Sequence, residues 1–453
     1  MNGAGSKSGG IPREKARHGL VRAAFRAAVP AAGIIVLAGC DLAKEAPPLS
    51  LGQVRAVREV EEVAPTPKNV KAVTVTASKA DAPSPALAGP VDVVFGGDVV
   101  PQARMLSENP SDLLQGALPL LAADGFVFNL EGPVGSRKSV PRDKTTLAFA
   151  TPASWLGKLL DASHATAFGA ANNHACDLEQ EGPLATQAFA DEQKATALGI
   201  GRTSPWRARV VAAHAGKRVC ALAWTTFLND ERKRHDTCRK GRGDILVARA
   251  GLDPEGYAFV RKVVADEATW EGCDARVAYV HGGIEYRPQS AKMMYLAHVI
   301  APSVDAVVFA HTHVPDGVEL LSVDGSSRQR KVPVFRSLGN LLSNQGAAWS
   351  EGMATTLLGD RGAGDPIRTV WTRVAMLARL RFEFGAGEKA PPGVSYGYDL
   401  AFMDRAGSHP TLMPLTHDSP IGEQLKRGAF GALMEDRCRR ADGGASDLPC
   451  RSR

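Results

Sequence analysis

The sequence predicts an α/β fold, and two features lead to this prediction. After residue 90, short apolar runs alternate with longer stretches of helical period, which is the pattern of layered sheets and helices. Five of these runs also stop at carboxylate, amide or imidazole side chains, and α/β sheets place their binding crevices at the carboxyl ends of strands. The composition agrees, since 453 residues with 44% apolar and 23% charged side chains suit a soluble globular protein.

Residues 1–39 are predicted to be a lipoprotein signal peptide. Basic residues precede the apolar run 27–38, which is too short to span a bilayer and ends at Leu-Ala-Gly-Cys. These four residues resemble a bacterial lipobox, in which the cysteine, here Cys40, is lipidated and becomes the new N-terminus. Asp41 fits retention at the periplasmic face of the inner membrane. The alternatives are an ordinary secreted protein and an uncleaved anchor.

Residues 40–90 are predicted to be a tether, because their many prolines and alanines can neither continue a helix nor feed a central strand. The net charge of +6 arises mainly from the signal region, so the body is nearly neutral. A nearly neutral body has no general electrostatic reason to bind nucleic acid. We therefore expect a local binding site and no nucleic-acid partner.

The side chains after the five apolar runs form a candidate metal site. They are Asp98 after 91–95, Glu131 after 126–128, Asn172, Asn173 and His174 after 165–171, His281 after 276–280, and His311 and His313 after 304–310. Each has an ordinary reading alone, as a turn, a helix cap or a structural histidine. Their joint occurrence in one order favours a site.

The chemistry of these residues suits one or two divalent ions of Mn, Fe or Zn. Carboxylate, amide and imidazole groups are their usual ligands, and the expected ligands are Asp98, Glu131, Asn173, His281, His311 and His313. A carboxylate can bridge two ions. Such a site favours an anionic substrate and acidifies bound water. His174 is expected to be the catalytic imidazole, with Asp177 orienting it.

The motifs GGD, NLEG, ANNHACD, HGGIEY, AHTH and RSLGN, in this order, resemble those of the CapA capsule synthesis family over roughly residues 91–345. That family is linked to poly-gamma-glutamate capsules and shares the calcineurin-like metallophosphatase fold. The resemblance implies a four-layer α-β-β-α sandwich, the same six ligands and the same catalytic imidazole. We assign residues 91–385 to this domain and 386–453 to a C-terminal extension. Asn172, Glu285 and Asn340, which lie in or near these motifs, are expected to bind substrate.

The sequence departs from the family pattern at two places near the site. Val100 stands where metallophosphatases usually have a histidine, so one ion loses a ligand and a single or weakly held second ion is possible. Gly282 replaces a tryptophan that the family typically has after the strand-end histidine. The departure at Val100 leaves the number of ions open.

A basic segment at residues 232–242 is a second candidate feature. Arg232 and Arg234 are predicted to hold a polyanion by screened Coulomb attraction, although a solvated surface loop explains the same charges. Six cysteines remain after the signal, and 15 pairings are open. Cys438 with Cys450 is our predicted pair, because it closes a short loop in a polar tail.

The resulting hypothesis is a lipid-anchored envelope protein that makes or exports an anionic polymer such as poly-gamma-glutamate, with hydrolase chemistry at the metal site. One alternative is an accessory subunit without catalysis that binds the polymer or a membrane synthase. Another is a general periplasmic phosphoesterase. The sequence has no Walker loop, Gly-x-Ser-x-Gly motif or dinucleotide fingerprint.

Overall fold

The computed structural model describes residues 89–102, 104–136, 148–229, 246–324, 330–349, 369–385, 391–407, 409–416, 418–426 and 438–440. These residues belong to the second of two compact units of the chain, Ala80–Arg453. The predicted signal peptide, the lipidation site Cys40 and the basic segment 232–242 lie outside the described residues. The predictions about them stay predictions.

Two β-sheets form the centre of the described body. The first contains β1 (Val91–Val100), β2 (Gly125–Leu130), β3 (Ala167–Gly169), β4 (Thr196–Leu198), β13 (Asn340–Ser343), β14 (Val374–Glu383), β15 (Gly393–Asp404), β16 (Thr411–Pro414) and β17 (Cys438–Arg440). The second contains β6 (Arg209–His214), β7 (Lys217–Thr225), β9 (Ala275–His281), β10 (Ala306–Ala310), β11 (Pro315–Val323) and β12 (Arg330–Leu338). A separate ribbon pairs β5 (Ile200–Gly201) with β8 (Leu246–Val247).

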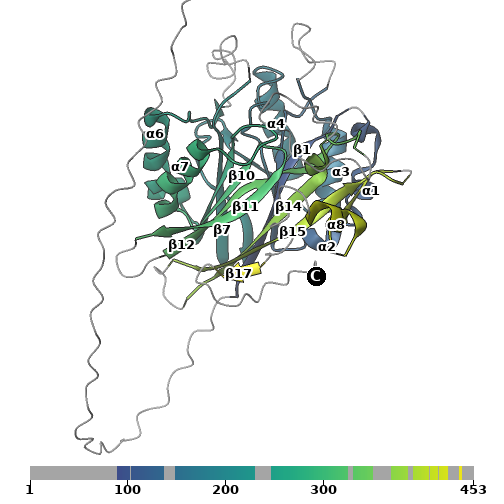
Figure 1. Cartoon of the computed structure of the whole chain (residues 1–453). Coiled ribbons are helices and arrows are strands. Elements are labelled where there is room, and N and C mark those ends of the chain that lie inside the picture. The colour runs from purple at the N-terminus through teal and green to yellow at the C-terminus, as the bar shows by residue number, and fades with distance from the viewer. Residues whose placement is uncertain are drawn as a thin grey trace, which may run out of the picture. The chain divides into compact units, whose positions relative to one another are not determined.

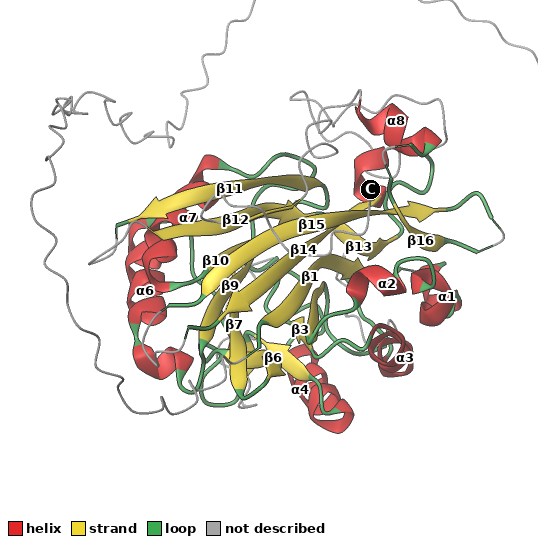
Figure 2. Ribbon diagram, turned by 90° about the horizontal axis from the view of Figure 1, so that it is seen from below, coloured by secondary structure: helices red, strands yellow, loops and turns green. Residues whose placement is uncertain are grey.

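Helices cover the outer face of each sheet (Figure 2). On the first sheet lie α1 (Pro110–Leu114), α2 (Leu118–Leu121), α3 (Ala153–Ser163) and α4 (Glu181–Gln193). On the second lie α6 (Pro254–Ala265) and α7 (Ala291–Ile300). The remaining described helices are α8 (Pro420–Lys426) and the short 3-10 helices η1 (Met105–Ser107), η3 (Glu267–Trp270), η4 (Ala301–Ser303) and η6 (Val370–Arg373).

Apolar side chains fill the three interfaces between the four layers of sheets and helices. Alternation along β1 sends Val93 and Phe95 into the space between the sheets and Val94 toward the helices. Along β9, Tyr279 faces the first sheet, whereas Val280 packs under α6 and α7. The predicted α-β-β-α sandwich is therefore confirmed.

Strand direction brings the polar strand ends together. β1, β2, β3 and β4 are parallel, and so are β7, β9, β10 and β12. The antiparallel strands β14, β15 and β16 extend the first sheet beyond β1. Figure 1 shows the strands of both sheets crossing the centre of the body, with α6 and α7 on one side and α1, α2 and α3 on the other. The carboxyl ends of β1 and β10 meet at one edge of the sandwich, where the His311 backbone N–H donates to Asp98.

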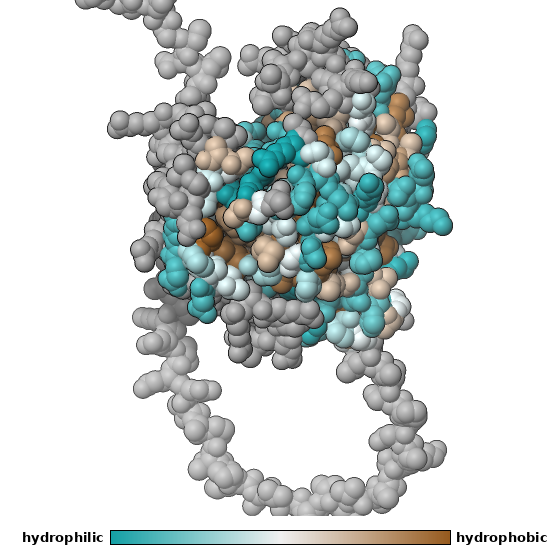
Figure 3. Space-filling view, turned by 90° about the vertical axis from the view of Figure 1, so that its right-hand side faces the viewer, coloured by the Kyte–Doolittle hydropathy of each residue, from teal (hydrophilic) through white to brown (hydrophobic). Residues whose placement is uncertain are grey.

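The predicted C-terminal extension contributes strands to the first sheet. β15 pairs with β14 over ten residues, from Val374–Phe402 to Glu383–Gly393, and β17 pairs with the other edge of β15. Residues beyond 386 therefore form part of the same folded body. Within the described residues, no helix has the length and apolarity needed to cross a bilayer. The visible described surface on the side of α1 and α3 is largely hydrophilic, with scattered apolar residues (Figure 3).

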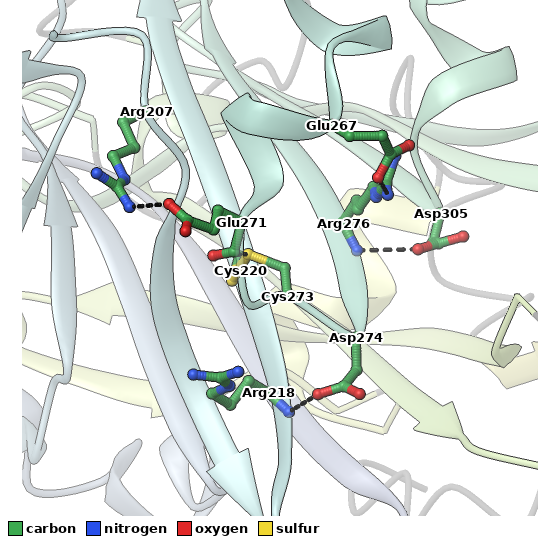
Figure 4. The surroundings of a disulfide bond; sticks show 9 residues. All are labelled: Arg207, Arg218, Cys220, Glu267, Glu271, Cys273, Asp274, Arg276 and Asp305. Atoms are coloured by element: carbon green, nitrogen blue, oxygen red, sulfur yellow. Dashed lines mark hydrogen bonds and ion pairs between the residues drawn. A yellow bond between two sulfur atoms is a disulfide. The ribbon is translucent and has the colours of Figure 1, made fainter. Parts of the chain in front are cut away.

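A disulfide joins Cys220 of β7 to Cys273 in the loop before β9 (Figure 4). Charged residues surround it: Arg207 pairs with Glu271 at 2.6 Å, and the Arg218 backbone N–H donates to Asp274 Oδ2 at 2.8 Å. Cys176 is also disulfide-bonded. Sequence alone does not choose Cys220 with Cys273 among the open pairings, because Cys220 is buried in a core, and Cys273 packs against that core, only once the sheet has folded. The predicted pair Cys438 with Cys450 lies outside the described side chains.

Candidate metal centre

Asp98 is placed by an irregularity in β1. The sequence predicted that this strand ends before Gly96, and this was wrong, because β1 continues to Val100 with register shifts on both sides of Asp98. A β-carbon at Gly97 would lie 1.9 Å from the carbonyl oxygen of Gly339, so glycine is required there. The bulge re-aims the Asp98 side chain into the interior between the sheets.

Asp98 is fully buried and fixed by two neighbours. Its Oδ1 accepts a hydrogen bond from Asn129 Nδ2 at 2.8 Å, and its Oδ2 accepts one from the His311 backbone at 3.1 Å. The same Oδ2 lies 3.3 Å from His313 Nδ1. Asp98 therefore links the first sheet to the loop after β10.

His311 and His313 reach the centre through a strained loop. Residues two apart in an extended chain would project to the same side, but the chain is not extended here. The backbone φ angles are +100° at His311 and +59° at His313, and such values are uncommon for residues other than glycine. Conformations of this kind cost about 1–3 kcal/mol each and cluster at functional sites. The two rings converge all the same, with centroids 5.9 Å apart.

A first group of ligand atoms gathers around His281 Nε2. This atom lies 2.8 Å from Asn173 Oδ1, 3.1 Å from His311 Nδ1 and 3.7 Å from Glu131 Oε1. A ring nitrogen carries at most one proton and can donate only one hydrogen bond, so it cannot satisfy all three neighbours. A cation among these four atoms would satisfy them together.

A second group gathers around His313 Nδ1. Its neighbours are Asn340 Oδ1 at 2.9 Å, Asp98 Oδ2 at 3.3 Å and Glu131 Oε2 at 3.6 Å. The two oxygens of Glu131 therefore face different groups. One carboxylate lies between two clusters of potential ligands, which is the arrangement of a bridging ligand.

Glu131 gives the sharpest test of whether a metal fits. It is fully buried, and neither carboxylate oxygen accepts a hydrogen bond from any residue that the structure describes. A buried carboxylate without donors costs several kcal/mol unless a cation compensates it. Two sets, Glu131 with His281 and His311, and Asp98 with Glu131 and His313, each offer ligand atoms within 4.8 Å of one another. Carboxylates and imidazoles match the preferences of Mn, Fe and Zn, so the donor set fits.

The protonation states of the metal-free site also favour a cation. Burial raises the pKa of the Glu131 carboxyl well above its usual value, and the charge of Asp98 raises it further. Burial and the neighbouring imidazoles lower the pKa values of His281 and His311. Burial alone would lower the pKa of His313, but Glu131 and Asp98 raise it to about 10. His281 and His311 are thus neutral, as ligands must be, whereas His313 holds a proton.

Metal binding is therefore expected to release protons. In the metal-free protein the His313 imidazole is charged at neutral pH, and its proton must leave before Nδ1 can bind an ion. We expect at least about one proton per protein, and an apparent metal affinity that rises about tenfold per pH unit below pH 9. Calorimetry in buffers of different ionisation enthalpy measures this release. An affinity that stays constant between pH 6 and 8 would contradict it.

His174 lies beside the first group. Its Nδ1 is 2.7 Å from Asp177 Oδ2, the carboxylate that the sequence analysis expects to orient it, and its Nε2 is 4.0 Å from Glu131 Oε1. The ring packs on Phe149 with centroids 4.1 Å apart. Asn229 Nδ2 contacts Nε2 at 3.1 Å. His174 is thus held from three sides with Nε2 toward the centre.

The residues predicted to bind substrate divide into four cases. Asn172 is fully buried, and its amide holds the Leu130 carbonyl and the His174 N–H, so we assign it to holding the loop. Asn340 is buried against His313, within the second group. Glu285 is exposed and near enough to raise the pKa of Glu131. Arg232 and Arg234 lie outside the described residues.

Two residues were missed by sequence reasoning. Asn129 donates to Asp98 and contacts His281 Nδ1 at 3.2 Å, and its position two residues before Glu131 in the NLEG motif was a usable signal. Asn229 contacts both Asn173 and His174, but it lies in no motif and carried no signal. Both amides fix the orientation of other site residues.

These features define a four-layer α/β protein with a buried candidate metal site at its strand ends. The family model described as "Bacterial capsule synthesis protein PGA_cap" matches residues 92–345, more than half of the chain. The chain belongs to this bacterial capsule synthesis family. No curated protein matches the sequence.

Two solved structures show a distant likeness. A hypothetical protein from Thermus thermophilus is 15% identical, with 68% of this chain and 98% of that chain covered and a TM-score of 0.34. A novel phosphatase from Mycoplasma pneumoniae is 12% identical, with 69% and 95% covered and the same TM-score of 0.34. The layers described above, rather than these distant likenesses, define the fold.

Proposed function

We propose that the protein is a metal-dependent hydrolase that acts on an anionic capsule polymer, with poly-gamma-glutamate as the first candidate. Family membership supports the role in capsule synthesis. The observation that carries the catalytic part is Glu131, a buried carboxylate whose two oxygens face two groups of potential ligands. The bond that is cleaved would be a phosphoester or an amide-type bond.

The residues that would hold the metal are those of the two groups. In the first group the ligands would be Asn173, His281, His311 and Glu131. In the second group they would be Asp98, His313 and Glu131. A bound divalent ion would supply a Lewis acid and lower the pKa of water. Val100 is buried in β1 and offers no ligand to the second group.

His174 would hold and move a proton at Nε2. Asp177 accepts from Nδ1, which fixes the tautomer and stabilises the imidazolium form. Asn229 and Phe149 limit rotation of the ring. The imidazole would thereby donate a proton to the leaving group, or stabilise charge that develops on the substrate.

We also propose that the protein acts at the periplasmic face of the inner membrane, anchored by lipid on Cys40. The support is the sequence around residues 27–41, with its apolar run and lipobox-like end. A membrane synthase is a candidate partner there. Incorporation of labelled palmitate into the wild type, and its loss in Cys40→Ala, tests the anchor.

An accessory role without catalysis is the second candidate. The observation in its favour is Val100, since the second group lacks the side-chain ligand that a histidine there would provide. On this reading the centre would bind polymer, or a partner synthase, without cleaving it.

Incubation of the metal-loaded full chain with poly-gamma-glutamate and with a simple phosphodiester tests the proposal. Metal-dependent shortening of the polymer supports it. Polymer binding without cleavage of either substrate, together with normal capsule output from a His174→Ala strain, supports the accessory role. Turnover of the phosphodiester alone, with capsule output unchanged in a deletion strain, supports a general phosphoesterase.

A further inference from the structure

Three arginines without carboxylate partners meet beside the candidate metal centre. Arg104 is exposed just after β1, Arg373 is buried at the start of β14, and Arg405 is half-buried just after β15. None of the three forms an ion pair with a residue that the structure describes. We call them the arginine cluster.

Short links hold the cluster together at the ends of these strands. Arg373 Nε donates to the carbonyl of Met403, two residues before Arg405, at 2.7 Å. Arg405 Nη2 donates to the carbonyl of Ser343 at 2.8 Å, and Ser343 pairs with Val100 of β1. Burial lowers the pKa of Arg405, and the charge of Arg104 lowers it further. The positive charges of Arg104 and Arg405 therefore lie close enough to repel each other.

Four other partly buried arginines provide an internal comparison. Arg379, Arg381, Arg330 and Arg276 each pair with a carboxylate, namely Asp399, Asp92, Asp305 and Glu267. A carboxylate thus neutralises each of these four desolvated guanidinium groups. The arginines of the cluster differ from these four, and they lie next to the site.

Nearby acids compensate the cluster only in part. Burial and the charge of Arg405 lower the pKa of Arg373 to about 10, although the charge of Asp404 raises it. Asp404 accepts from the Ala406 backbone at 3.0 Å and forms no ion pair with Arg373. Glu108 pairs with His409 at 2.8 Å. The cluster therefore carries an excess of positive charge.

The position of Arg373 is built into the fold. Its guanidinium lies 4.4 Å from the ring centre of Phe402 and 5.6 Å from that of Trp349. A β-carbon at Gly346 would lie 2.5 Å from Arg373 Cγ, so a glycine there makes room for the side chain. An arginine packed in this way is a fixed positive charge rather than a mobile surface residue.

The cluster lies at a short distance from the centre along β13. Asn340, at one end of the strand, contacts His313 at 2.9 Å, and Ser343, at the other, contacts Arg405. Three residues of strand span about 10 Å at ~3.3 Å per residue. An anion held by Arg104 and Arg405 would therefore belong to a part of the substrate away from the bond at the centre.

We propose that Arg104, Arg373 and Arg405 form a subsite for an oxyanion group, carboxylate or phosphate, of a substrate that also reaches the metal centre. Guanidinium groups recognise both oxyanions through paired N–H donors. The inference rests on the proposed function, and it specifies that function as action on a substrate with a second anionic group about 10 Å from the reacting bond. Arg104 and Arg405 would contact the anion, and Arg373 would add its charge from the buried side.

Calorimetric titration of the metal-loaded full chain tests this subsite, with poly-gamma-glutamate in one arm and inorganic phosphate in the other. Arg104→Gln and Arg405→Gln are each expected to weaken binding about tenfold, because each removes charge-assisted hydrogen bonds. Binding by the wild type should weaken as salt is added. The arm that shows the loss identifies the oxyanion. Arg261→Gln, an exposed residue of α6, is the matched control for the change in net charge.

Two outcomes would overturn the subsite: wild-type protein that binds neither probe, and cluster variants that bind both probes as tightly as Arg261→Gln does. The urea midpoint of each cluster variant, compared with that of Arg261→Gln, checks that any loss of binding does not come from misfolding. Cluster variants with normal binding, alongside metal-site variants without turnover, would refute the subsite and leave the proposed function standing. Loss of binding in the cluster variants, with full activity in His174→Ala, would support the subsite and refute the proposed role of His174 in catalysis.

Discussion

His174→Ala is expected to lower turnover by about 10²–10⁴-fold and to leave the metal content unchanged. A positioned general acid contributes this range, and His174 Nε2 faces the centre while Asp177 holds Nδ1. Its Nε2 lies 4.0 Å from Glu131 Oε1 but belongs to neither ligand group. Metal analysis and rate measurements on the same preparation separate the two effects.

The control for this variant is His298→Ala, because His298 is an exposed histidine on α7. It should keep both rate and metal. If His174→Ala loses metal in proportion to its rate, then His174 acts as a ligand and the assigned role in proton transfer is wrong.

Glu131→Gln is expected to have the largest effect on the metal. The amide keeps the shape of the side chain but cannot present two anionic oxygens to the two groups. Loss of an outer partner of a ligand already costs about 10–100-fold in affinity, so we expect a loss of at least about a hundredfold here. Dialysis against the metal, followed by elemental analysis, measures it.

The same variant should make the metal-free protein more stable. Burial raises the pKa of Glu131, so above its ordinary pKa the folded state binds more protons than the unfolded state, and stability falls as the pH rises. A neutral amide removes this dependence, with an expected gain of about 1–3 kcal/mol at neutral pH. Urea unfolding of metal-free protein tests the sign. Glu192→Gln, an exposed residue of α4, is the control and should change neither property.

Much of the fold and the composition of the site were predictable from sequence, because both follow from local patterns. Apolar runs with polar ends predicted an α/β fold with a binding site at the carboxyl ends of its strands, and the structure brings Asp98, Glu131 and His281 together there. Strand ends were harder. The bulge that carries β1 past Gly97 depends on the approach of Gly339, which lies far away in the sequence.

The features that sequence could not predict depend on contacts between distant segments. The positive φ angles of His311 and His313 arise where the loop meets Asp98 and Asn340. Asn229 becomes a neighbour of His174 only once the two sheets pack. The arginine cluster joins residues spread over three hundred positions, so no local charge run marks it.

Anomalous diffraction from a crystal of the full chain loaded with Mn or Zn tests the central claim most directly. We predict metal density between Glu131 and His281, with Asn173 and His311 as further ligands, and with Glu131 shared if a second ion binds beside His313. Density only at surface residues, or a loaded crystal in which Glu131 gains protein hydrogen bonds instead of an ion, would contradict the account.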